Sequence, residues 1–114
     1  MGVDLIGRGG DASFNWGCWR TCLGIAIAFG WQPAGTIAHP DHDGDWDGGY
    51  FTNDFQEVSD SDARALGVAL HRAVASVRTG QALTEEQAKA LDGMHIDVVC
   101  ELADYAVSGR FAIS

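Results

Sequence analysis

The residues best suited to chemistry stand close together in an acidic segment near the middle of the chain. In the frame that begins at Asp43, this segment reads Asp43-x-Asp45-x-Asp47-Gly48, with Asp54 at the twelfth position. Such spacing is typical of a calcium loop, in which three side-chain oxygens, one backbone carbonyl and a closing carboxylate surround the ion. The pattern therefore predicts calcium binding by residues 43–54. The ligand set would be Asp43, Asp45, Asp47, Gly49 and Asp54.

Three features of this segment depart from the usual calcium loop. The closing residue is Asp54 rather than a bidentate glutamate, and Tyr50 stands where an aliphatic residue is typical. The preceding Ala38-His39-Pro40 does not supply a helix that leads into the loop. The same carboxylates can instead repel one another, keep the loop mobile and solvated, and present a charged face to a protein partner.

The chain is strongly acidic, and its charge is unevenly distributed. Seven lysine and arginine residues stand against sixteen aspartates and glutamates, which gives a net charge of −9. Such a chain repels the phosphates of nucleic acids and of anionic membranes, so neither is expected as a partner. Residues 41–62 contain no lysine or arginine and eight of the acids, namely Asp41, Asp43, Asp45, Asp47, Asp54, Glu57, Asp60 and Asp62.

We therefore expect a small, non-enzymatic interaction protein of the immunity or phage-inhibitor type. It would present the acidic face of residues 41–62 to a basic surface on a protein partner. The calcium-binding module is the first alternative, and a small thiol or hydrolytic enzyme is the second. The residues expected to contact the partner are Asp41, Asp43, Asp45, Trp46, Asp47 and Glu57.

Cysteines and histidines provide the residues for the enzyme alternative. Cys18, Cys22 or Cys100 could act as a nucleophile, with His71 or His95 as the base. No neighbouring sequence indicates that any of these thiols is activated, so no catalytic residue is assigned.

The same residue types also allow a zinc site. Cys18 and Cys22 are one helical turn apart, and His39 with His42 would complete four ligands. Small thiols beside Trp19 are more often core residues, and this is the interpretation that the sequence favours.

Polar residues among aromatic ones suggest a buried network that holds the fold together. Arg20 is expected to form an ion pair with Asp54 or Asp4, with Asn53 alongside. A structural role is favoured over a ligand site for this set of Asp4, Arg20, Asn53 and Asp54.

The helices and strands that must position these residues can be predicted from sequence patterns. They indicate an α+β fold in one domain over residues 1–114. Residues 3–6 and 110–113 have strand patterns and are expected to pair, and residues 49–52 predict a further short strand. Three main helices are expected: residues 16–29 after the cap Asn15, a helix after Ser59, and a segment after Thr84 that Gly93 splits or kinks. They would pack on a small antiparallel sheet that includes both ends of the chain.

The start of the chain has no long apolar run, and no stretch approaches the length of a membrane span. The three cysteines lack the spacing of a disulfide framework. We therefore expect a cytoplasmic protein.

Short motifs along most of the chain resemble a known group of proteins. They are Met1-Gly2-Val3-Asp4-Leu5-Ile6-Gly7, Asn15-Trp16-x-x-Trp19-Arg20, Tyr50-x-x-Asn53-Asp54 and Gly109-Arg110-Phe111-x-Ile113. The order is similar to that in small uncharacterised bacterial and phage-associated proteins that begin Met-Gly-x-Asp-x-x-Gly, although Arg110 stands where those have a second glycine. The resemblance implies a bacterial or phage origin and supplies no activity.

Overall fold

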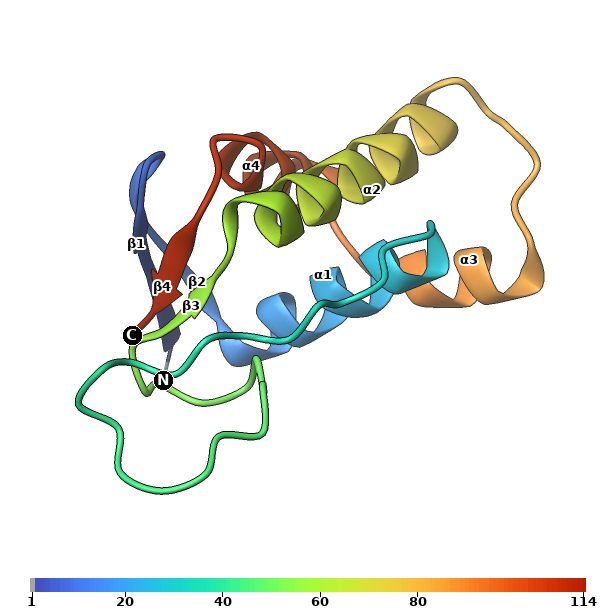
Figure 1. Cartoon of the computed structure of the whole chain (residues 1–114). Coiled ribbons are helices and arrows are strands. Elements are labelled where there is room, and N and C mark those ends of the chain that lie inside the picture. Colours follow the sequence, from blue (N-terminus) through green and yellow to red (C-terminus); the bar gives the residue numbers. More distant parts are fainter. Residues whose placement is uncertain (1) are drawn as a thin grey trace.

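A four-stranded antiparallel sheet joins the two ends of the chain (Figure 1). The computed structural model describes residues 2–114, with strands β1 (Gly2–Gly7), β2 (Gly10–Asn15), β3 (Gln56–Val58) and β4 (Phe111–Ile113) in the order β2-β1-β4-β3. Leu5 of β1 lies opposite Ile113 of β4, which confirms the expected pairing of the terminal strands. Val3 and Leu5 alternate with exposed residues and are fully buried, so β1 turns one face to the core.

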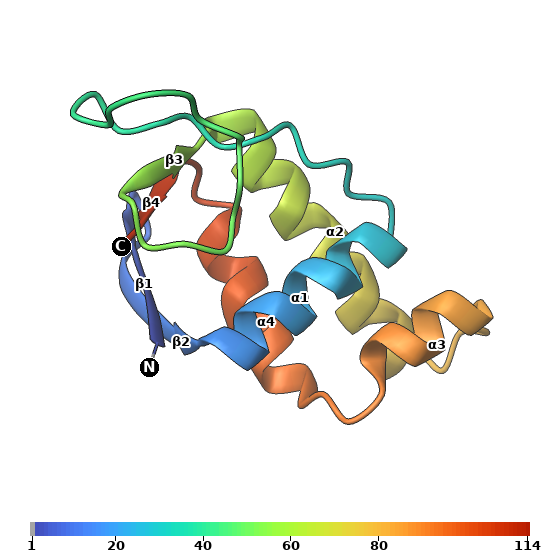
Figure 2. The same cartoon turned by 90° about the horizontal axis from the view of Figure 1, so that it is seen from below.

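Helices cover that inner face of the sheet (Figures 1 and 2). They are α1 (Trp16–Ala28), α2 (Asp60–Arg78) and α4 (Ile96–Ala106), whereas α3 (Glu85–Leu91) packs against α1 away from the sheet. The α+β class is therefore confirmed, but residues 2–114 contain four helices where three were predicted. The segment after Thr84 divides at Gly93, whose φ of 74° lies in the left-handed region that ends a helix.

Caps predicted from the sequence begin three of these helices. The Asn15 side chain accepts a hydrogen bond of 2.7 Å from the Cys18 amide, and Thr84 with Gln87 forms a full capping box. Ser59 accepts a hydrogen bond of 3.3 Å from the Asp62 amide. The Asp62 carboxylate does not bond back to the Ser59 amide to complete a capping box, because it turns inward to other donors.

Close packing of α2 against α4 depends on Gly67. A Cβ atom at this position would lie 2.5 Å from the Val107 side chain and 3.0 Å from the carbonyl oxygen of Ala103. Leu66 and Leu70 flank the glycine and are fully buried. The absence of a side chain at Gly67 therefore allows the two helices to pack in close contact.

Between α1 and β3 the chain forms a wide irregular loop at the β3 edge of the sheet (Figures 1 and 2). Ile37 and Glu57 exchange two backbone hydrogen bonds of 2.8 Å, which attach the loop to β3. The strand predicted over residues 49–52 does not form, because Tyr50 turns into the core and contacts both long helices. Among residues 2–114, no helix has the length and hydrophobicity needed to cross a membrane.

Candidate functional site

A buried carboxylate fixes the irregular loop to the first turn of α2. Asp62 is only 3% exposed. Its Oδ1 accepts hydrogen bonds from the indole nitrogen of Trp31 at 3.0 Å and from the amide of Ala34 at 3.2 Å. Its Oδ2 accepts one from the hydroxyl of Tyr50 at 2.6 Å. Three donors and the positive end of the helix dipole offset the desolvation of the charge.

Tyr50 connects the same loop to both α1 and α2. Its hydroxyl accepts a hydrogen bond of 2.9 Å from the Gly35 amide, and its carbonyl accepts one of 2.8 Å from the indole of Trp19. Burial, and then the hydrogen bond to Asp62, raises the pKa of Tyr50 well above its ordinary value. At Gly35 and Tyr50 the loop is therefore hydrogen-bonded to the core rather than solvated.

A second set of hydrogen bonds shapes the part of the loop between Thr36 and Gln56. The Thr36 hydroxyl donates to the Gly49 carbonyl at 2.6 Å, and the Trp46 indole donates to both oxygens of Thr36 at 3.1 Å. The fully buried Gln56 amide donates to the Thr52 carbonyl at 2.8 Å and to the Gly49 carbonyl at 3.3 Å. These bonds cross-link residues 36, 49 and 52 and hold the turn between them.

The cross-linked turn borders a hollow of about 490 Å³ that is open to solvent, which we call the acidic hollow. Trp46 and Phe51 provide aromatic surface, and three aspartates provide negative charge. The His42 ring lies edge-on to the Trp46 ring, with centroids 5.0 Å apart. The lining residues are His42, Asp45, Trp46, Asp47, Gly49, Phe51, Thr52 and Asp54.

The acidic hollow brings together some of the predicted contact residues and not others. Asp45, Trp46 and Asp47 line it, whereas Asp41 and Asp43 are exposed on the loop outside it. The sequence missed His42, Phe51 and Thr52 as lining residues. The one available signal was Phe51, a large apolar residue within an acidic segment.

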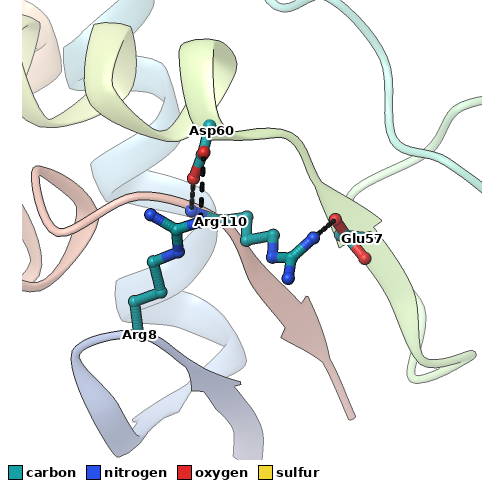
Figure 3. Close-up of polar contacts among 4 residues, drawn as sticks. All are labelled: Arg8, Glu57, Asp60 and Arg110. Carbon is teal, nitrogen blue, oxygen red and sulfur yellow. Dashed lines mark hydrogen bonds and ion pairs between the residues drawn. The ribbon is translucent and has the colours of Figure 1, made fainter.

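Three acidic residues at the end of the predicted face have other roles. Asp62 is buried, Asp60 accepts a hydrogen bond of 2.8 Å from the Arg110 amide, and Glu57 lies 3.8 Å from the Arg110 guanidinium (Figure 3). Arg8 approaches Asp60 at 3.6 Å. The Arg110 amide, followed by the nearby arginines, lowers the pKa of Asp60. The free acidic surface therefore ends at Asp54.

The predicted calcium ligands are not gathered around one point. Within residues 2–114, no group of three or more histidine, cysteine, aspartate or glutamate side chains is placed to hold a metal ion. Asp47 instead accepts a hydrogen bond of 2.9 Å from the amide of Gly49 and so caps its own turn. The zinc set is likewise not assembled: Cys18 and Cys22 lie on α1, whereas His39 packs edge-on against Phe55.

The expected polar network of Asp4, Arg20, Asn53 and Asp54 does not form. In the described part of the chain, Arg20 makes no ion pair with either carboxylate, and its guanidinium lies over the Phe51 ring, 5.2 Å from the centroid. Asp4 is on the outer face of the sheet, where Ser13 donates to it at 2.6 Å. Asn53 donates to the Ser114 carbonyl at 2.7 Å. This prediction failed because strand alternation directs Asp4 away from the helices.

None of the thiols and histidines forms a nucleophile–base pair in the described residues. Burial, and then the neighbouring Cys18, raises the pKa of Cys22 to about 12, so that its thiol stays protonated. His71 lies 3.2 Å from Asp104, and His95 is exposed where α4 begins. The described residues therefore provide no assembled nucleophile and base of the kind that a thiol or hydrolytic enzyme would use.

Comparisons with protein-family models, with curated proteins and with solved structures give no match to this chain. The resemblance to small bacterial and phage-associated proteins therefore stays a prediction. Support for a function comes from the geometry of the loop and the acidic hollow.

Proposed function

We propose that this chain is a non-enzymatic interaction protein that binds a basic surface on a protein partner. An inhibitor of the immunity or phage-encoded type is the class that this description fits. The contact surface would be the outer side of residues 37–55. The observation that carries the proposal is the exposure of carboxylates and large apolar side chains together on one anchored loop.

Large apolar side chains are unusually exposed on this loop. Ile37 is 56% exposed, Phe51 46% and Phe55 55%. Exposed aromatic residues are typical anchors of protein interfaces, where they fill pockets on the partner. Their position among aspartates favours a partner surface that is both apolar and basic.

Negative charge on the same loop favours a positively charged partner surface. Asp41, Asp43, Asp45, Asp47 and Asp54 are all exposed, and residues 41–62 contain no lysine or arginine. Such a surface accelerates the encounter with a basic partner and repels acidic ones. The attraction weakens as salt screens the charges.

The loop is also held in one shape before any partner arrives. Phe55 has a φ of 56°, a left-handed conformation that costs a non-glycine residue about 1–3 kcal/mol. Its amide donates a 2.9 Å hydrogen bond to the Ile113 carbonyl, which extends the sheet and maintains this conformation. A loop that is ordered in advance loses less entropy on binding.

The test compares two variants with the same net charge. One replaces Asp43, Asp45 and Asp47 by Asn, and the control replaces Glu86 by Gln, Asp92 by Asn and Glu101 by Gln, all exposed on or between α3 and α4. Proteins captured by the wild type are then purified, and their affinities for the wild type, the loop variant and the control are measured at low and high salt. An affinity that the loop charges do not affect, or that does not fall with added salt, contradicts the proposal.

Calcium binding is the second candidate function, and one observation favours it. Asp45, Asp47 and Asp54 belong to the predicted ligand set and line the same hollow. Binding would require the loop to rearrange, because Asp47 now caps the turn at Gly49. A melting temperature that rises in millimolar calcium for the wild type, but not for Asp43→Ala or Asp54→Ala, would support this function. A flat calorimetric titration would exclude it.

A further inference from the structure

We propose that the acidic hollow receives one arginine side chain of the protein partner. This inference rests on the proposed function, because it names the group that the basic partner would insert. A guanidinium matches the hollow in three respects: the size of the space, the aromatic walls and the available carboxylates.

The hollow is large enough for a side chain and is built to keep its shape. Its volume of about 490 Å³ lies within the range of small-molecule sites. The Trp46 indole nitrogen is hydrogen-bonded to Thr36, which fixes the ring against the wall. Gln56 holds the opposite turn through the carbonyls of Gly49 and Thr52.

Aromatic surface in the hollow suits a planar cation. A guanidinium stacks on aromatic rings more readily than an ammonium group does, because it is planar and less strongly hydrated. The structure already contains one such contact, since Arg20 lies 5.2 Å from the centroid of the Phe51 ring. Phe51 also lines the hollow, so the same ring contacts the exposed Arg20 and borders the space for an arginine of the partner.

Carboxylates in the hollow attract the positive charge of a guanidinium and can accept its hydrogen bonds. Three aspartates line the hollow against the single positive charge of Arg20 beside it, so the local charge still attracts a cation. Within residues 2–114, the side-chain oxygens of Asp45 and Asp54 accept no hydrogen bond, whereas one oxygen of Asp47 is occupied by the Gly49 amide. A guanidinium carries five N–H donors in a fixed fork, which two free carboxylates can accept.

Blocked tripeptides test the assignment without a known partner. The probes are Gly-Arg-Gly, Gly-Lys-Gly and a citrulline peptide that keeps the shape of arginine but not its charge. Each is titrated into the isotopically labelled protein while amide resonances are followed. We expect the arginine peptide to shift the amides of residues 45–54 and to bind more tightly than the lysine peptide. The citrulline peptide should shift none of them.

Three variants separate the hollow from the general charge of the loop. Phe51→Ala should weaken binding of the arginine peptide roughly tenfold, whereas the control Phe55→Ala, somewhat more exposed but outside the hollow, should not change it. Arg20→Ala should strengthen binding several-fold, because it removes a competing guanidinium and a positive charge. The melting temperature of each variant verifies that the fold is intact.

Several results would overturn the inference. They are shifts by the arginine peptide confined to residues that neither line nor shape the hollow, equal binding of the citrulline or lysine peptide, and equal effects of Phe51→Ala and Phe55→Ala. If a basic partner still depends on the loop aspartates while Phe51→Ala leaves its affinity unchanged, the hollow assignment fails and the proposed function stands. If the arginine peptide binds in the hollow but no partner depends on the loop charges, the proposed function fails instead.

Discussion

The hydroxyl of Tyr50 donates a 2.6 Å hydrogen bond to the carboxylate of Asp62, and both side chains are buried. This contact joins the acidic loop to the first turn of α2. It explains how a loop with so many like charges keeps a defined shape: one aspartate is used internally as an anchor. The exposed aspartates are then free to face a partner.

Replacing the anchor should destabilise the protein. Asp62→Asn removes the charge and leaves a single oxygen to accept from Trp31 and Ala34, so we expect a loss of about 1–3 kcal/mol in the free energy of unfolding. Urea denaturation measures this loss. Asp43→Asn, the same change at an exposed position, should stay within about 0.5 kcal/mol of the wild type. Equal stabilities of the two variants would show that Asp62 is not an anchor.

Tyr50 makes the stability depend on alkaline pH. Its pKa in the folded chain is raised above the ordinary tyrosine value of 10.0, so the stabilisation is complete below that pH. It is lost progressively as the pH rises toward the folded-state pKa, because the unfolded chain releases its proton first. Tyr50→Phe should therefore lose less stability than the wild type as the pH rises above about 10.

Urea unfolding at several pH values compares the two chains. Tyr105 serves as the reference, since burial also raises its pKa and it remains in the variant. The free energy of unfolding of the variant should therefore still fall at alkaline pH, because of Tyr105, but by less than that of the wild type. Identical pH profiles would mean that burial and the hydrogen bond to Asp62 do not hold the Tyr50 hydroxyl in its neutral form.

Two glycines in helices should respond oppositely to alanine. Gly67→Ala forces a methyl group against Val107 and the Ala103 carbonyl, which should cost about 1–3 kcal/mol. Gly24→Ala places the methyl group on the exposed side of α1, with nothing within 4 Å, and should stabilise by about 0.5–1 kcal/mol. Thermal denaturation distinguishes the two signs. A neutral Gly67→Ala would contradict the close packing of α2 on α4.

Thiol reactivity tests the enzyme alternative. The pKa of Cys22 is raised to about 12 and the residue is buried, so it should resist alkylation in the folded protein near neutral pH. Cys18 and Cys100 are half-buried and should react first. Mass spectrometry after limited alkylation identifies the modified residue. Rapid, selective reaction of Cys22 would indicate an activated thiolate and favour a thiol enzyme.

Much of the scaffold follows from local patterns in the sequence. The alternation of residues 3–6 predicts a strand with one buried face. Asn15, Ser59 and Thr84 begin helices because their side-chain oxygens accept hydrogen bonds from backbone amides of the first turn. Such signals need only neighbours along the chain. They predicted the class of the fold and the pairing of its terminal strands.

The site depends on contacts that no local pattern indicates. Asp62 resembles any acidic residue at the start of a helix, yet its donors Trp31 and Tyr50 come from distant points in an irregular loop. Thr36 and Gln56 also shape the acidic hollow, because Thr36 donates to the Gly49 carbonyl and Gln56 reaches back to the carbonyls of Gly49 and Thr52. The sequence therefore indicated the acidic segment but not which of its charges point inward.

The most direct test of the central claim is the dissociation constant for the captured partner, measured at low and high salt. The wild type is compared with the variant in which Asp43, Asp45 and Asp47 are replaced by Asn. We expect binding by the variant to be at least about tenfold weaker at low salt and less dependent on salt. Equal dissociation constants and equal salt dependence would contradict an acidic loop that binds a basic protein.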